Sequence, residues 1–308
     1  MAYAFHSDQH EAIRLLQCRV VANLFASSVR ERFAIKGGLA LQAVMGSERA
    51  TADLDLDAAK DLPVDRLREA LREAIEKSLA GVLHEVHVTE PKQTETVCRW
   101  KIWGFLPGTT SEVHFKVEVS RRDALATPDD AQWCDWRSEG HIVEGVRVKA
   151  HRPDMLCFMK LKALLSPARD APRDIHDLNV LISAGYRPAP ESMEKLGDGE
   201  LLAMADEAWS KIELMDYPRF MSEVAPYLPP AQAKIVDEAF YDELRIRVGS
   251  TVEQWMVDEI DRRLGEGASR QTRDAISSRL SARRSELSPE GGLPASGATR
   301  AVPCHASS

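Results

Sequence analysis

Two aspartates one residue apart, Asp53 and Asp55, are the residues whose types and spacing point most directly to chemistry. In a β-strand, alternate side chains point to the same face, so both carboxylates would lie together while Leu54 points into a core. Adjacent carboxylates repel each other unless a cation lies between them. Their hard oxygen atoms suit Mg²⁺, which completes its coordination with waters and substrate phosphates. The pair therefore predicts a metal-assisted reaction of a phosphate-containing substrate.

A glycine pair, Gly37 and Gly38, precedes these aspartates at the start of a predicted short helix. Because glycine has no side chain, backbone N–H groups can approach a phosphate at a helix N-terminus, where the helix dipole favours negative charge. Each feature alone has an ordinary explanation, since Gly-Gly usually forms a tight turn and Asp-Leu-Asp often forms a solvated strand edge or a helix cap. Together they predict a nucleoside triphosphate held by Mg²⁺.

A third carboxylate is expected on a neighbouring strand, where it would help to activate an attacking hydroxyl. Glu118 is the candidate, because it lies between Val117 and Val119 in a segment that alternates polar and apolar residues. The alternative is a strand with one solvent-facing side. We assign Glu118 to the metal site with Asp53 and Asp55, either assisting there or serving as the base toward the acceptor hydroxyl.

A second charged segment follows about 40 residues later, in a predicted pair of helices. Asp174 and Asp177 are three residues apart and so share one helix face. Both lie in a first turn, where negative charge is favoured, so helix stabilisation would explain them. Lys160 and Lys162 belong to the preceding helix. A lysine there could offset triphosphate charge, although an isolated exposed lysine is usually a solvated surface residue.

The order Gly-Gly, helix, Asp-x-Asp resembles the DNA polymerase β-like nucleotidyltransferases. The runs Phe33–Gly38 and Arg49–Asp55 are more closely similar to the AbiEii/AbiGii-type toxins, and so is the segment from Lys160 to Leu178 with its Arg-Asp-x-x-Asp-Leu. The last segment separates this family from other nucleotidyltransferases. One departure is Leu39, where the family often has a hydroxyl residue that could contact the triphosphate.

The resemblance implies a Mg²⁺-dependent enzyme that transfers a nucleotide from a nucleoside triphosphate to an RNA and releases pyrophosphate. Some members of this family of type IV toxins and abortive-infection proteins extend tRNA 3′ ends, and a cognate antitoxin is an implied partner. Two alternatives stay open. The acceptor could be a protein side chain, or the chain could be a catalytically silent protein that binds a nucleotide or a partner.

The resemblance also implies roles for individual residues. Lys160, with Lys162 as the alternative, would offset triphosphate charge, helped by an arginine, and one of the two later aspartates would orient that lysine or the nucleotide. The expected catalytic residues are Asp53, Asp55, Glu118, Lys160, Asp174 and Asp177, of which Asp53, Asp55 and Glu118 bind metal, and the expected nucleotide-binding residues are Gly37, Gly38, Arg49, Lys162 and Arg173.

Composition sets the broad class. The 308 residues, 44% hydrophobic and 29% charged, suit one large domain or two small ones. We expect no membrane span, because no apolar run approaches about 20 residues. Five scattered cysteines and an N-terminus unlike a signal peptide predict a cytoplasmic protein with reduced thiols. Because the net charge is −8, any RNA contact must depend on a local patch.

The hydrophobic pattern predicts the elements that must position the site. We expect an α/β fold of the nucleotidyltransferase type, with a mixed sheet and flanking helices, followed by a mainly helical C-terminal half. The expected domains are 1–150 (the α/β domain), 151–287 (a helical domain that completes the active site) and 288–308 (a disordered tail). The expected early elements are a helix over residues 8–31, a strand at Phe33–Lys36, a helix at Leu39–Met45, a strand at Ala52–Leu56 and a helix from Pro63 to about Leu79.

The expected later strands are Gly81–Thr89, Cys98–Leu106, Val113–Ser120 and Gly145–Ala150, with helices following from near Pro153. Four tryptophans fall in or near these strands. They could stack on nucleic-acid bases, but packing in the core and turns is the preferred explanation. The four are Trp100, Trp103, Trp133 and Trp136.

Overall fold

The structure is a computed structural model that describes residues 2–122, 130–136, 146–166 and 170–265. The chain divides into two compact units, residues 1–259 and 260–308. The sheet and the candidate site described below belong to the first unit. The disordered tail predicted over residues 288–308 lies outside the described part of the chain. The domain boundary at residue 150 remains a prediction.

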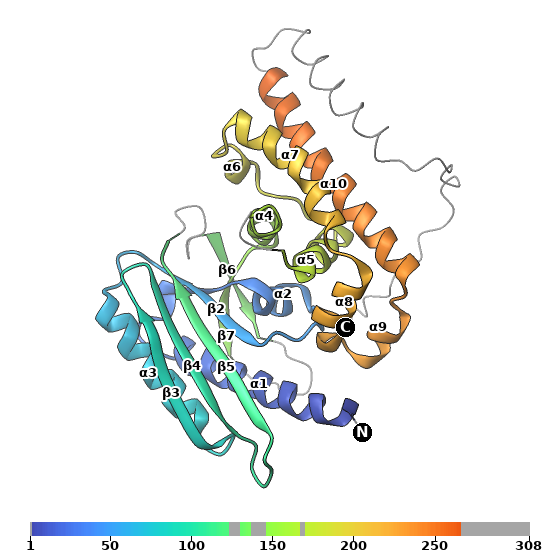
Figure 1. Cartoon of the computed structure of the whole chain (residues 1–308). Coiled ribbons are helices and arrows are strands. Elements are labelled where there is room, and N and C mark those ends of the chain that lie inside the picture. The colour runs from blue at the N-terminus through green and yellow to red at the C-terminus, as the bar shows by residue number, and fades with distance from the viewer. Residues whose placement is uncertain (1, 123–129, 137–145, 167–169, 266–308) are drawn as a thin grey trace. The chain divides into compact units, whose positions relative to one another are not determined.

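One mixed sheet is the scaffold of the first unit (Figure 1). Its described strands are β1 (Phe33–Ile35), β2 (Asp53–Ala58), β3 (His84–Gln93), β4 (Val97–Phe105), β5 (Glu112–Ser120), β6 (Ala131–Asp135) and β7 (Arg147–His151). They follow the order β3-β4-β5-β2-β1-β7-β6. Strand β2 runs antiparallel to β1 and parallel to β5. This mixed sheet with flanking helices confirms the predicted fold class.

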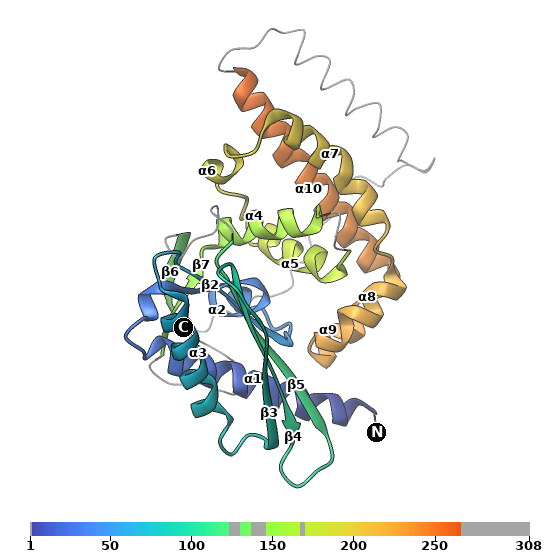
Figure 2. The same cartoon turned by 60° about the vertical axis from the view of Figure 1, so that its left-hand side comes forward.

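One face of the sheet is apolar and covered by helices. Strand β2 contributes Leu54 and Leu56 to this face, and both are fully buried. Helices α1 (Ala2–Phe25) and α3 (Val64–Leu79) pack against each other on this side of the sheet (Figures 1 and 2). Helix α3 buries leucines at four-residue spacing and leaves its charged side chains in solvent. Polar residues of β2 and β5 therefore lie on the opposite face.

The described residues from 153 to 265 are mainly helical, as the sequence predicts. Prolines begin several of these helices, where their missing N–H costs nothing. The sequence pattern missed strand β6 and helix α8, which are short and weakly periodic. The helices are α2 (Gly37–Met45), α4 (Pro153–Leu164), α5 (Pro172–Ser183), α6 (Pro190–Met193), α7 (Asp198–Glu213), α8 (Tyr217–Glu223), α9 (Pro230–Ile235) and α10 (Glu238–Gly265), with short 3₁₀ turns at Arg30–Arg32 (η1) and Ala225–Tyr227 (η3).

The first helix is shorter than predicted at its C-terminal end. It ends at Phe25 instead of continuing to residue 31, and the 3₁₀ turn η1 leads from it into β1. Within the described residues no helix is both long and apolar enough to cross a membrane.

Candidate active site

The aspartates of β2 lie on the polar face of the sheet, at the point where β2 meets β5. The parallel register places Lys116 beside Asp53 and Glu118 beside Asp55. Lys116 Nζ lies 2.9 Å from Asp53 Oδ2. Glu118 Oε2 accepts a hydrogen bond from Arg99 Nε on β4 at 2.7 Å and lies 2.6 Å from Nη2 of the same guanidinium group. The structure thus brings the predicted carboxylates to one face, but Arg99 engages Glu118.

Two of these carboxylates, Asp53 and Asp55, are of the chemical type that binds a divalent metal ion. Among the described residues, no three acidic, histidine or cysteine side chains are close enough to hold a metal ion together. Mg²⁺ does not need three, because it binds through one or two carboxylates and keeps waters and substrate phosphates as its other ligands. Burial and the neighbouring Asp53 charge raise the pKa of Asp55, and Lys116 offsets this only in part. A cation between Asp53 and Asp55 would relieve the same repulsion.

Gly37 lies directly against this pair. Its φ of +66° is a left-handed conformation that other residues adopt at a cost. A Cβ at this position would lie 3.2 Å from Asp55 Oδ2. The turn into α2 therefore approaches the Asp55 carboxylate as closely as only glycine allows.

A buried cluster that the sequence analysis missed fixes this turn. Asp57, two residues after Asp55, is 3% exposed. Its Oδ1 accepts a hydrogen bond from Lys36 Nζ at 2.6 Å, and its Oδ2 lies 2.9 Å from His151 Nε2 on β7. Because Lys36 directly precedes Gly37, the cluster ties the start of α2 to β2 and β7. The alternation of polar and apolar residues that continues from Asp55 to Asp57 is the sequence feature that could have indicated Asp57.

The second charged segment forms a buried ionic network. Arg49 donates two parallel hydrogen bonds to Asp177, with Nε–Oδ1 and Nη2–Oδ2 distances of 2.9 Å each. Lys160 Nζ lies 2.5 Å from Asp177 Oδ2 and 3.0 Å from Asp174 Oδ1. All four side chains are buried. The network therefore joins α4 and α5 to the segment that leads into β2.

Two cations, Arg49 and Lys160, face the carboxylates of Asp174 and Asp177 in this network. His176 Nδ1 lies 3.5 Å from Asp177 Oδ1. Burial alone would raise the pKa of Asp177, but the Arg49 and Lys160 charges hold it well below its usual value. Asp177 is therefore ionised at neutral pH. The ammonium group of Lys160 contacts two buried carboxylates. Lys162 is exposed instead, and its Nζ lies 5.8 Å from the centroid of the Phe158 ring.

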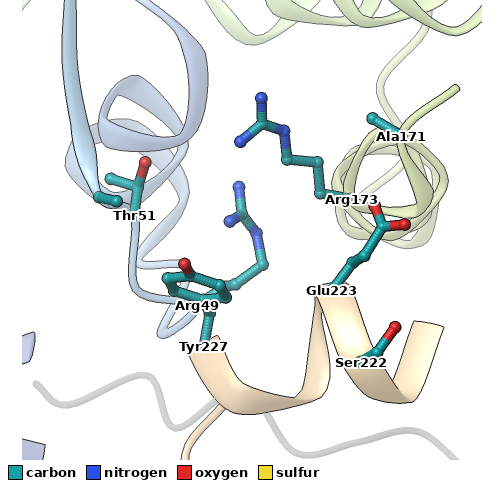
Figure 3. Close-up of a pocket in the computed structure, with 8 residues that line it drawn as sticks. Arg49, Thr51, Ala171, Arg173, Ser222, Glu223 and Tyr227 are labelled. Atoms are coloured by element: carbon teal, nitrogen blue, oxygen red, sulfur yellow. The ribbon is translucent and has the colours of Figure 1, made fainter. Parts of the chain in front are cut away.

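A pocket of about 380 Å³ adjoins this network (Figure 3). The guanidinium groups of Arg49 and Arg173 both point into it, from the β2 side and from α5 respectively. Arg173 is exposed in the first turn of α5 and has no hydrogen-bond or ion-pair partner among the described residues. The lining residues are Arg49, Thr51, Ala52, Ala171, Arg173, Ser222, Glu223 and Tyr227.

Gly38 connects the glycine turn to this pocket. A Cβ on Gly38 would lie 2.8 Å from Arg49 Nη2 and 3.4 Å from Thr51 Oγ1. Leu39, in contrast, is 1% exposed and packs in the core. Thr51, which the sequence pattern does not single out, places a side-chain hydroxyl beside Gly38.

One wall of the pocket comes from α8 and η3, which carry Ser222, Glu223 and Tyr227. Tyr227 also accepts, through its backbone oxygen, a hydrogen bond from Ala50 N at 2.7 Å. This bond ties the helical region to the segment that carries Arg49. Ser222, Glu223 and Tyr227 are not predicted from the sequence pattern, because the elements that hold them are too short to give a periodic signal.

A family model described as "Nucleotidyl transferase AbiEii toxin, Type IV TA system" matches residues 19–249. The match spans most of the chain and includes both charged segments. The chain belongs to this AbiEii toxin family. Nucleotidyltransferase is therefore its enzyme class, as the resemblance implied, and the type IV toxin–antitoxin systems are its family context.

Solved structures share the fold of this AbiEii-family protein. JHP933 from Helicobacter pylori superimposes with a TM-score of 0.51 at 20% identity, covering 83% of this chain and 97% of its own. A second structure from Helicobacter pylori, of a protein provisionally named a nucleotidyltransferase, gives a TM-score of 0.48 at 19% identity. The match covers 80% of this chain and 94% of the other. No curated protein shows a significant match to the chain.

A pair of glycine substitutions tests the approach of Gly37 to Asp55. Gly37 and Gly46 have nearly the same φ, +66° and +65°, but a Cβ on Gly46 would meet nothing within 4 Å. We expect Gly37→Ala and Gly46→Ala each to lower the free energy of unfolding by about 1–2 kcal/mol, because both force alanine into a left-handed conformation. Only Gly37→Ala should also impair transfer.

Urea denaturation and a nucleotidyl-transfer assay measure the two effects separately. Equal transfer by the two variants would show that the closeness of Gly37 to Asp55 has no part in the reaction.

Proposed function

We propose that this AbiEii-family enzyme is a Mg²⁺-dependent nucleotidyltransferase that moves a nucleoside monophosphate from a triphosphate to the 3′ end of an RNA, with tRNA as the preferred acceptor. It would act in the cytoplasm as a toxin held in check by a cognate antitoxin. The observation that supports the proposal best is the Asp53–Asp55 pair beside a glycine turn and an arginine-lined pocket.

In this proposal Asp53 and Asp55 hold the metal, which neutralises charge on the triphosphate when it is bound. Glu118 is the candidate base toward the acceptor hydroxyl, because it lies beside Asp55 in the register. To take that role it must be released by Arg99, which binds it at 2.6–2.7 Å. Arg99 would then be free to pair with the incoming phosphates.

The pocket suits the triphosphate. A positive charge in the first turn of a helix is disfavoured by the helix dipole, so an unpaired Arg173 at that place indicates an anionic ligand. Arg49 faces it across the pocket. The backbone at Gly37 and Gly38 would seat phosphate oxygens, and Thr51 would supply a hydroxyl beside them.

Lys160, Asp174 and Asp177 take a supporting role in this proposal. Lys160 contacts both buried aspartates, and Asp177 holds Arg49 through two hydrogen bonds. Lys160 would therefore position Arg49 by fixing Asp177, and offset triphosphate charge only through that arginine. A bidentate carboxylate pairing sets the plane and direction of a guanidinium group, which favours a fixed geometry in the pocket.

Replacing Arg173 by alanine is expected to raise the KM for the nucleoside triphosphate about tenfold or more, because a charge-assisted contact to phosphate is lost. Folding stability should not fall, since a positive charge leaves a helix N-terminus. Steady-state kinetics and thermal melting measure the two effects. Arg66→Ala on α3 is the matched control, because Arg66 is also an exposed arginine near a helix N-terminus. An unchanged KM for Arg173→Ala would remove it from the nucleotide site.

One experiment tests the proposed function itself. The protein is incubated with each labelled triphosphate, Mg²⁺, total tRNA and cell protein, with Asp53→Ala and a chelator as controls. Label in RNA that depends on Asp53 and Mg²⁺ supports the proposal. Label in protein indicates nucleotidylation of a protein target. No transfer, together with no effect of expression on cell growth, indicates a protein that only binds a nucleotide or partner.

A further inference from the structure

The polar face of the sheet extends past the catalytic carboxylates onto β4 and β3. The antiparallel register places Lys101 of β4 beside Lys116 of β5, next to the pair formed by Lys116 and Asp53. One step further along, Trp103 lies between His87 of β3 and His114 of β5. Along the strands of this face, the cations Lys101 and Lys116 are therefore followed by the planar rings of His87, Trp103 and His114.

These side chains are accessible. Lys101 and His87 are exposed, and the side chain of His114 is 70% exposed. Trp103 is partly exposed, whereas Trp100, which points to the opposite face, is fully buried. In Figure 1 helix α1 passes behind β5, and the front of β3, β4 and β5 is open.

The rings are arranged as a stacking surface. His87 lies parallel to Trp103, with ring centroids 4.0 Å apart and an interplanar angle of 11°. Phe105 meets the Trp103 ring edge-on at 6.1 Å, and His84 lies 5.8 Å from Phe105. An aromatic group in the core would be surrounded by aliphatic side chains. These rings instead project from an open strand face beside lysines.

Charge favours an anionic occupant. Lys101 has no ion-pair partner among the residues that the structure describes. Lys116 pairs with Asp53, so binding of a metal to Asp53 would release a second cation onto the same face. The chain as a whole carries −8. Glu112 Oε2 lies 3.3 Å from His114 Nε2, so the unpaired charge among these described side chains is that of Lys101. An unpaired cation beside Lys116, on an acidic protein, is the kind of local feature that an RNA contact would need here.

We propose that this face, which we call the β4 platform (His87, Lys101, Trp103, His114 and Lys116), binds the single-stranded 3′ end of the acceptor RNA. Bases stack on the His87–Trp103 pair, and the phosphates that follow lie against Lys101 and Lys116. Every base has a flat face that can stack on an aromatic ring, and neighbouring cations can contact the backbone phosphates. This inference rests on the proposed transfer to RNA, because it assigns the platform to the acceptor.

The position of the platform suits this use. Trp103 lies four residues along β4 from Arg99, the partner of Glu118. At about 3.3 Å per residue this is about 13 Å. An unpaired strand stacked at Trp103 thus reaches the carboxylates of β2 and β5 with its last few nucleotides.

Binding of a fluorescently labelled single-stranded oligoribonucleotide, without any triphosphate, tests the platform. We expect Trp103→Ala and Lys101→Ala each to weaken binding about tenfold, and Trp103→Phe to restore most of the affinity. Lys101→Ala should also make the affinity less dependent on salt, by about one unit of log–log slope. Binding of a labelled triphosphate should not change in either variant.

Matched controls lie elsewhere on the surface. Tyr186 is 40% exposed, and the side chain of Lys77 on α3 is 60% exposed. Tyr186→Ala and Lys77→Ala should bind the oligoribonucleotide like the wild type. Thermal melting of all variants shows whether a loss of binding is a loss of folding, and Trp103→Phe remains informative if Trp103→Ala does not fold.

The outcomes separate this inference from the proposed function. If RNA is labelled but Trp103 and Lys101 variants bind and react like the wild type, the platform is overturned while transfer to RNA stands. If the platform variants lose RNA binding but the wild type transfers no nucleotide to RNA, the binding surface stands and the proposed function fails. Wild-type protein that does not bind single-stranded RNA, or that labels only protein, overturns the platform.

Discussion

Asp55→Asn is expected to lower nucleotidyl transfer at least about a thousandfold and, in the absence of metal, to raise folding stability. The loss of activity follows because a neutral amide is a poor ligand for Mg²⁺, and several kcal/mol of charge stabilisation correspond to about three powers of ten in rate. The gain in stability follows because the wild-type carboxylate is buried beside Asp53. The two effects have one cause, the concentration of negative charge at this point.

The sign of the stability effect depends on pH. Because the pKa of Asp55 is raised in the folded protein, folding favours its protonated form. Wild-type stability therefore falls as the pH rises from the ordinary carboxyl pKa through the raised one. Asp55→Asn has no carboxyl group at this position, so its stability does not fall for this reason over this pH range. The difference in unfolding free energy between the variant and the wild type should be small in acid and should grow to a constant value at higher pH.

Chemical denaturation across a pH series, with and without Mg²⁺, measures this difference, and the transfer assay measures the activity. Asp65→Asn is the matched control, because the Asp65 side chain is 96% exposed and belongs to α3, which packs on the opposite, apolar face of the sheet. Added Mg²⁺ should stabilise the wild type and the control but not Asp55→Asn. Equal stabilisation of all three by Mg²⁺ would contradict the assignment of Asp55 as a metal ligand.

Asp177→Asn is expected to cause the largest loss of stability, about 3–5 kcal/mol, because it leaves Arg49 and Lys160 buried without their shared counter-charge. Activity should fall as well, since Arg49 loses the two hydrogen bonds that orient it. Where the variant still folds, its KM for the triphosphate should rise more than its kcat falls. This pattern separates a misplaced pocket arginine from a general loss of folded protein.

The pH dependence again has a definite sign. The pKa of Asp177 is held well below its ordinary value of 3.8, so its contribution is complete above that value. It is lost as the pH falls further toward the lowered pKa. The stability difference between wild type and Asp177→Asn should thus be constant from mild acid to neutral pH and shrink only in strong acid. Asp258→Asn is the control, because Asp258 forms a partly exposed pair with Arg187. A loss for Asp177→Asn no greater than for this control would contradict the network.

Features encoded within one element could be predicted from the sequence. The position of Asp53 and Asp55 on one strand face follows from the period of a β-strand, and the shared face of Asp174 and Asp177 follows from the period of a helix. The alternation around Glu118 likewise predicts that it shares the polar face of its strand with Lys116. These predictions need no knowledge of which elements are neighbours.

Features that depend on a neighbouring element could not be predicted in this way. The pairing of Glu118 with Arg99 depends on β4 lying beside β5, and the burial of Lys160 depends on how α4 and α5 pack. Periodicity gives the face on which a side chain lies but not what covers it. The pocket wall at Tyr227 belongs to a turn too short to give a periodic signal.

The bond between Arg49 and Asp177 joins residues 128 positions apart, and Tyr227 lies further still along the chain. A ribosome making this protein therefore completes the carboxylate pair of β2 long before it makes the partner of Arg49 or the far wall of the pocket. Until then Arg49 lacks its carboxylate partner and the pocket lacks one wall. If the pocket holds the triphosphate as proposed, the order of synthesis itself would delay activity until most of the chain has emerged.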